Sequence, residues 1–167
     1  MTRTDTPPSW DERAVLTTML DYARATVHAK CQGLAEEDAR RAPLPGSPLM
    51  TVSGLVSHLR WVEYYWFRVA LLGEEDEGPW TEDDLDREMR LGPERPLAEL
   101  LAEYEAECER GRRLVASLDL DASAARPGGD GRHPTLRWVL THLVEETARH
   151  NGHLDVLREL ADGVTGA

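Results

Sequence analysis

The 167-residue chain is long enough for one domain with a full hydrophobic core, and its formal net charge is −12. This acidity argues against nucleic acid and anionic membrane surfaces as partners, because both are negatively charged. No apolar run reaches the roughly 18 residues that span a bilayer, and the N-terminus lacks a secretory signal. We therefore expect a cytoplasmic protein with a single domain over 1–167, in which residues 1–9 form a flexible tail.

Helical periodicity dominates the chain, and no segment alternates apolar and polar residues as a strand does. The long helices are predicted over 9–31, 51–72, 96–118 and 135–161. Ser9 can cap the first of them, and Gly73 follows the second, where glycine is common. A short acidic piece is expected at 35–41 and a short helix at 81–90.

Four long amphipathic helices in a chain of this length predict an all-α fold, a four-helix bundle. Two of the connections, 32–50 and 73–95, are longer than a tight turn requires. We therefore expect a bundle that differs from a simple up-down-up-down arrangement with short loops.

Polar side chains lie on the apolar stripes of two predicted helices. At about 100° per residue, His58 is at the centre of the stripe of the second helix. The apolar residues within about 60° of it are Leu55, Val62, Tyr65, Val69 and Leu72. On the last helix, His150 falls near the centre of the stripe and Glu146, one turn earlier, on its flank. An acid and imidazoles in a helical core are costly unless something satisfies them.

His58, Glu146 and His150 are therefore candidate metal ligands, because bundles build metal sites from inward-facing residues of neighbouring helices. Two histidines and one glutamate leave zinc an open position, which is typical of catalytic rather than structural sites. Nickel, iron and manganese accept the same donors. The residues alone leave two interpretations open, a divalent metal site or core histidines satisfied by hydrogen bonds.

Other side chains flank this set. His142 lies one turn before Glu146, where it can orient the carboxylate or contact a neighbouring helix. His153 follows His150 by three residues and is the candidate for proton transfer, or a partly exposed polar residue. Aromatic residues in the stretch 61–67 wrap the second helix on several sides. This indicates burial against more than one neighbour, in the core or at a subunit interface.

Two stretches resemble a known family. The stretch 145–159, EETARHNGHLDVLRE, is similar to the last-helix signature of DinB-like bundle proteins, and 54–67 is similar to their second helix. The closest resemblance is to the branch that holds the mycothiol S-transferase-like proteins and the metal-binding domain of mycothiol-dependent maleylpyruvate isomerase. The resemblance covers about residues 10 to 165.

The resemblance implies a four-helix bundle that holds a divalent metal, often zinc or nickel, on three side chains. One ligand comes from the second helix and two come from the last helix, four residues apart, and His58, Glu146 and His150 occupy these positions. Many DinB-like proteins have His-x-x-x-His on the last helix, whereas the isomerase branch resembles this chain in having glutamate first. The resemblance also implies a homodimer.

The function that the resemblance implies is a metal-dependent S-transferase, which joins a low-molecular-weight thiol such as mycothiol to a small electrophile, as in detoxification. An open metal position would bind the thiol as thiolate and lower its pKa. Zinc is the expected metal, and His153 is the expected proton-transfer group. The isomerase carries a further C-terminal domain, so a chain that ends at Ala167 is expected to be a transferase instead. The alternative is a non-catalytic stress protein of the same family that binds a metal or a small ligand.

Overall fold

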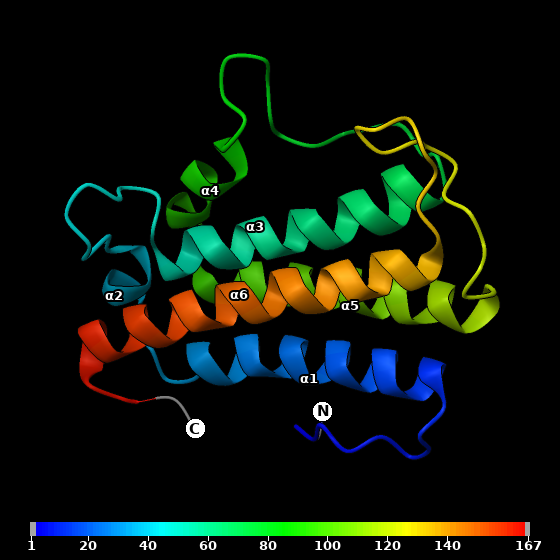
Figure 1. The fold of residues 1–167 in the computed structure, drawn as a ribbon. Helices are drawn as coiled ribbons and strands as arrows, with labels where there is room; N and C mark the ends of the chain where they lie inside the picture. Colours follow the sequence, from blue (N-terminus) through cyan, green and yellow to red (C-terminus); the bar gives the residue numbers. More distant parts are fainter. Residues whose placement is uncertain (1–2, 166–167) are drawn as a thin grey trace.

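The computed structural model of the protein describes residues 3–165, which form a helical bundle (Figure 1). The long helices are α1 (Glu12–Cys31), α3 (Val52–Tyr64) with its continuation η1 (Tyr65–Leu71), α5 (Leu97–Ser117) and α6 (Leu136–Asp162). The short ones are α2 (Glu36–Arg40), α4 (Arg87–Leu91) and η2 (Gly92–Glu94). The described part of the chain holds no strand, so the all-α prediction is confirmed. No helix within it is both long and apolar enough to cross a membrane.

The long helices run as two parallel pairs. The colours of Figure 1 show that α1 and α6 run in one direction and that α3 and α5 run in the other. α1 packs against α6 and α3 packs against α5, while α3 also contacts α6. Because α3 and α5 are parallel, the chain between them returns along the bundle and carries α4 on its way. The bundle is therefore not up-down-up-down, as the long connections predicted.

α1 begins slightly later than the sequence predicts. Its N-cap is Asp11, whose carboxylate accepts a hydrogen bond from the Ala14 amide at 3.0 Å. Ser9, the expected cap, lies outside the helix and donates its hydroxyl to Asp11 instead. A carboxylate close to the first free amides also complements the helix dipole, which explains why Asp11 takes this position.

The second long helix covers nearly the predicted range 51–72, but it changes type at Tyr65. The segment from Tyr65 to Leu71 is a π-helix, and it closes with a hydrogen bond from Leu72 N to Phe67 O of 3.3 Å. A π turn takes more residues than an α turn, so the buried face rotates. Phe67 is buried, whereas Leu72, which the α-helical stripe placed in the core, is 47% exposed.

The helix predicted over 81–90 is also shorter than expected. α4 begins only at Arg87, because Thr81 and Asp84 form a tight turn before it. Thr81 N is 3.1 Å from Asp84 O, and Asp84 N is 3.2 Å from Thr81 O. α4 packs against α3 and places Glu88 in the interior of the bundle.

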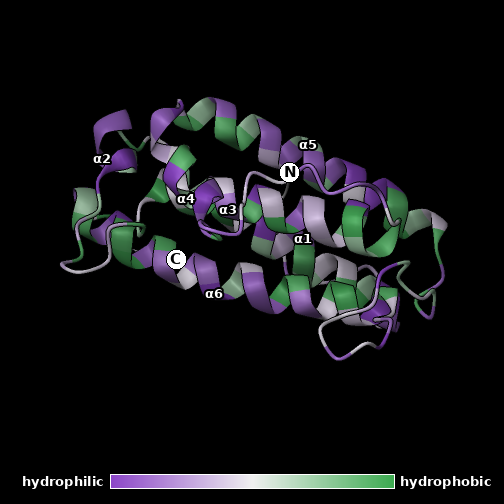
Figure 2. Ribbon diagram, turned by 90° about the horizontal axis from the view of Figure 1, so that it is seen from above, coloured by the Kyte–Doolittle hydropathy of each residue, from purple (hydrophilic) through white to green (hydrophobic). Residues whose placement is uncertain are grey.

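The hydrophobic core consists of two clusters with a polar layer between them. Figure 2 shows hydrophobic and hydrophilic residues mixed along every long helix, as in amphipathic helices. One cluster contains Val27, Leu55, Leu59, Tyr104 and Leu154, and the other contains Leu20, Phe67, Val115, Leu140 and Leu143. Arg24, Glu63, Glu146 and Thr147 are buried at intermediate positions of their helices. Buried polar groups require partners, which makes this layer the place to look for a site.

The expected N-terminal tail runs beside α1. The Arg3 guanidinium lies over the Tyr22 ring, with 5.3 Å between its carbon and the ring centroid, and Arg3 donates to the Thr26 hydroxyl at 3.1 Å. Residues 1–2 of that tail lie outside the described residues. The mobility of the segment stays a prediction.

Candidate metal centre

His58, Glu146 and His150 lie together in the middle of the bundle. His58 is on α3, and Glu146 and His150 are one turn apart on the neighbouring α6. Glu146 Oε1 is 3.3 Å from His58 Nε2 and 3.0 Å from His150 Nε2. One ligand atom from each residue lies within 4.8 Å of the other two. The structure thus brings together the three side chains that the sequence singled out.

The arrangement of these donor atoms fits a small divalent cation. Two ligands of a tetrahedral zinc ion, each about 2.1 Å from it, are about 3.4 Å apart. The observed separations of 3.0 and 3.3 Å are close to that value. The side chains of His58, Glu146 and His150 are 22%, 11% and 13% exposed. They are mostly buried, and each keeps a small exposed surface.

Glu88 on α4 orients His58. Its Oε1 is 2.9 Å from His58 Nδ1, so Nδ1 carries the hydrogen and Nε2 is directed at Glu146. Histidine ligands of metals usually donate their other nitrogen to a carboxylate in this way. The second carboxylate oxygen of Glu88 is buried and has no hydrogen-bond partner among residues 3–165.

His142 does not contact Glu146. Its ring stacks on Trp138 with 5.0 Å between centroids, and it meets Trp66 edge-on at 4.8 Å. Arg149 instead takes the place next to the carboxylate, because its guanidinium donates to Glu146 Oε2. Of the two interpretations that the sequence left open for His142, the contact with a neighbouring helix is the correct one.

The charges at the centre keep one carboxylate ionised. Burial alone would raise the pKa of Glu146, but the hydrogen bond from His58, the interaction with His150 and the positive charge of Arg149 hold it below its usual value. Burial would lower the pKa of His58, yet its hydrogen bonds to Glu88 and Glu146 raise it. The pKa of His150 is lowered by burial and by the charge of His58. A cation must therefore displace a proton from His58, so cation binding is expected to weaken in acid.

One known family matches most of the chain. The Mycothiol-S-transferase family model matches residues 15–163. The chain belongs to this family. The match includes α3, α4 and α6, which carry all the residues of the centre, and it confirms the resemblance drawn from the two helical stretches. A comparison of the sequence with curated proteins gave no match.

In this member of the Mycothiol-S-transferase family, an aromatic hollow of about 210 Å³ adjoins the centre. It is lined by Trp61, Tyr65, Trp66 and Trp80, together with His58 and Glu88. The aromatic residues of the second helix thus divide into two groups, since Tyr64 and Phe67 are buried in the core instead. The signal that could have singled out Trp80 is its position as a lone tryptophan in an acidic connection.

Replacing Glu88 by glutamine is expected to weaken metal binding without unfolding the protein. Glutamine keeps the size of the side chain but loses the charge that holds the hydrogen on His58 Nδ1. Loss of such a partner typically lowers metal affinity or activity by about 10–100-fold. Competition with a chromophoric chelator measures the affinity. Glu105→Gln is the matched control. Glu105 also pairs with a histidine, since its Oε2 is 3.1 Å from His28 Nε2, but this pair is not part of the centre. Equal affinities in the two variants would contradict the role of Glu88.

Proposed function

We propose that the protein is a metal-dependent S-transferase of the cytoplasm that joins a low-molecular-weight thiol, such as mycothiol, to a small electrophile. The observation that carries this proposal is the convergence of His58, Glu146 and His150 beside an aromatic hollow in a member of the Mycothiol-S-transferase family. Zinc is the proposed metal, and nickel, iron and manganese suit the same donors. The homodimer that the family resemblance implies is part of the proposal.

The chemistry follows from the donor set. A divalent cation held by these side chains supplies a positive charge that lowers the pKa of a thiol beside it, so that the thiolate forms near neutral pH. The sulfur attacks an electrophilic carbon, a carbon–sulfur bond forms, and the bond to the leaving group breaks with its electron pair. The thiol proton ends on a basic leaving group, or in solvent when the leaving group is a halide, so the products are a thioether, the leaving group and a proton bound to one of these acceptors.

His153 is proposed to carry this proton. Its Nδ1 is 3.2 Å from His150 Nδ1, and one of the two atoms carries the hydrogen while the other accepts it. His150 is directed at the centre through its Nε2, which faces Glu146. His153 is only partly buried, so it connects the centre to solvent. An imidazole suits this task because it gains and loses a proton near neutral pH.

A conjugation assay tests the proposal. The zinc-loaded protein is incubated with mycothiol and monobromobimane, and the fluorescent thioether is followed over time, with cysteine and glutathione as alternative thiols. We expect a rate above the uncatalysed one that scales with protein concentration and is lost after chelation. If no thiol reacts faster with the loaded protein than without it, the transferase proposal is wrong. A protein that binds metal and ligand without turnover would then be the correct description.

A further inference from the structure

The size of the aromatic hollow limits what it can hold. A cavity of about 150 Å³ in another protein accepts benzene, and pockets for drug-sized ligands begin near about 300 Å³. The hollow, at about 210 Å³, lies between these values. It therefore fits one ring or two small fused rings. Because His58 and Glu88 belong to its wall, a molecule in the hollow touches the metal centre.

The shape of the wall favours a flat occupant. The Trp80 ring stands at 73° to Trp61 and at 75° to Tyr65, with centroid distances of 5.8 and 6.2 Å. Trp66 crosses Tyr65 at 85° with 5.5 Å between centroids. Aromatic rings attract one another in edge-to-face and offset arrangements. Walls at nearly right angles offer a planar ring both kinds of contact, which a branched aliphatic group cannot use.

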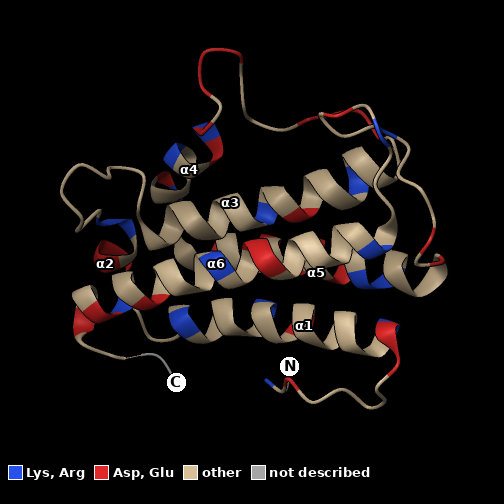
Figure 3. Ribbon diagram, in the orientation of Figure 1, with Lys and Arg blue, Asp and Glu red and all other residues tan. Residues whose placement is uncertain are grey.

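The charges around the hollow disfavour an anionic occupant. Among the described residues that line it, Glu88 is a carboxylate and none is lysine or arginine. The connection that carries Trp80 is acidic (Figure 3), and Asp76 accepts a hydrogen bond of 3.2 Å from the indole nitrogen. Arg60 covers one face of Trp61 at 3.7 Å but is not among the lining residues. An anionic ring would lose its hydration here without gaining a cationic partner.

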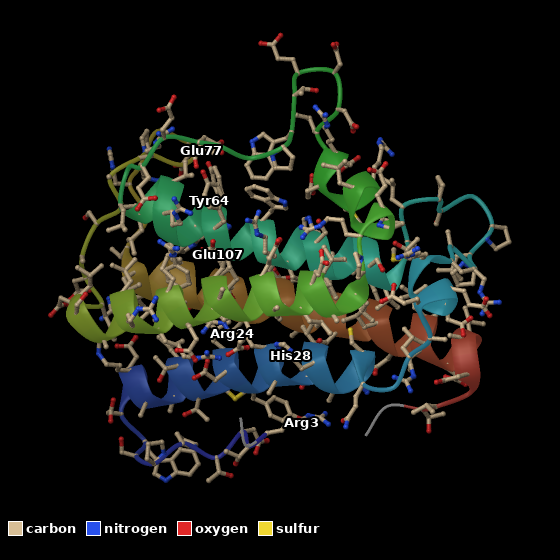
Figure 4. All side chains as sticks on the ribbon, turned by 180° about the vertical axis from the view of Figure 1, so that it is seen from behind. Arg3, Arg24, His28, Tyr64, Glu77 and Glu107 are labelled. Atoms are coloured by element: carbon tan, nitrogen blue, oxygen red, sulfur yellow. The ribbon has the colours of Figure 1, made fainter. Side chains whose placement is uncertain are left out.

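Trp80 closes the hollow and is held there by its own segment. A Cβ atom on Gly78 would lie 2.1 Å from Trp80 Cζ2, so the indole packs directly on the glycine. The Tyr64 hydroxyl donates to the Glu75 carbonyl at 3.0 Å and accepts from the Glu77 amide at 2.7 Å. Figure 4 shows Tyr64 directed from α3 toward the segment that contains Glu77. These contacts fix the segment, and with it Trp80, above the bundle.

We propose that the hollow is the electrophile subsite and that it selects planar electrophiles of one or two rings that carry no negative charge. This inference rests on the proposed S-transferase function and names its substrate class. A ring in the hollow, against the side chains that line it, places its reactive carbon beside His58, where the thiol is activated. The sulfur forms its bond to that carbon, the leaving group departs with the bonding electron pair as a halide ion, and the thiol proton passes to solvent.

Two variants test the subsite in the zinc-loaded full chain. Trp80→Ala removes the wall, and Gly78→Ala displaces it without altering a lining residue. The value of kcat/KM is measured for 1-chloro-2,4-dinitrobenzene, a planar ring, and for iodoacetamide, which is acyclic, with the same thiol. We expect the ratio of the two values to fall at least ~10-fold in both variants, since ring contacts are lost. Trp80→Phe keeps an aromatic ring at this position, so the ratio of the two kcat/KM values should stay close to that of the unaltered chain.

Gly129→Ala is the matched control for the glycine variant, because a Cβ atom there meets nothing within 4 Å. It should leave the ratio unchanged. An unchanged ratio in both Trp80→Ala and Gly78→Ala would overturn the subsite.

A binding measurement separates failure of the subsite from failure of the transferase. 1,3-Dinitrobenzene has the same planar ring but no leaving group, so calorimetry reports its binding without turnover. We expect one site per chain and a dissociation constant that rises at least ~10-fold in Trp80→Ala. Conjugation of iodoacetamide without binding of the ring would refute the subsite and keep the transferase. Binding that depends on Trp80 without any conjugation would refute the transferase and support the ring selectivity.

Discussion

A His58→Ala variant is expected to purify with little bound metal and to lose conjugating activity. His58 is the one proposed ligand from α3, and without it two ligands remain, both on α6. The loss should exceed the ~10–100-fold effect of removing a partner that only orients a ligand. Elemental analysis after gentle purification measures the metal per chain, and kcat/KM measures the activity.

His28→Ala is the matched control for this prediction. His28 is a partly exposed histidine of α1 that pairs with Glu105, so its loss should leave metal content and activity unchanged. Full metal occupancy in His58→Ala would refute the proposed site. Loss of activity together with full occupancy would assign His58 to the binding of substrate instead.

The convergence of the three candidate ligands could be predicted because it depends on helical periodicity. His58 lies in the regular part of its helix, and Glu146 and His150 lie in a helix of 27 residues, so a period of 3.6 residues shows which way they face. The same rule failed for Leu72, because the π turns begin at Tyr65 and change the period. Local sequence carries little signal for such a change, which depends on how Phe67 packs in the core.

Other residues of the site depend on tertiary contacts that periodicity does not show. Glu88 is in a helix of five residues, which is too short for a pattern to indicate its buried face. Trp80 is in a connection whose course is set by contacts such as the hydrogen bonds of Tyr64. The pair formed by Arg24 and Glu63 joins residues 39 positions apart. Only the packing of α1 against the rest of the bundle brings them together.

Replacing Glu63 by leucine is expected to lower the free energy of unfolding by about 3–5 kcal/mol. Arg24 Nε is 2.7 Å from Glu63 Oε1, and Nη2 is 2.6 Å from Oε2, with side chains 3% and 1% exposed. Figure 4 shows Arg24 between α1 and α5. Burial would lower the pKa of Arg24, but the charge of Glu63 raises it, so the guanidinium stays charged. Without Glu63, that charge loses its buried partner and keeps its ion pair with the partly exposed Asp21.

Urea denaturation and thermal melting measure this effect. At about 2–4 °C per kcal/mol for a chain of this size, the melting temperature should fall by about 6–20 °C. The double variant Arg24→Leu/Glu63→Leu should recover much of the loss, because apolar replacements of a whole buried ion pair are often neutral or stabilising. A Glu63→Leu variant that loses less than about 1 kcal/mol would show that the guanidinium finds other partners or solvent.

The metal content and activity of Glu63→Leu show whether the Arg24–Glu63 pair contributes to stability alone or also to the metal centre. Glu63 is five residues after His58, which places it about 140° further round α3, and it faces Arg24 rather than the candidate ligands. If the pair serves stability alone, Glu63→Leu kept at a temperature where it is folded should bind zinc and conjugate thiols like the unaltered chain. A loss of metal under those conditions would mean that the buried pair also positions His58 through α3. The Arg24–Glu63 pair and the candidate metal centre would then be coupled.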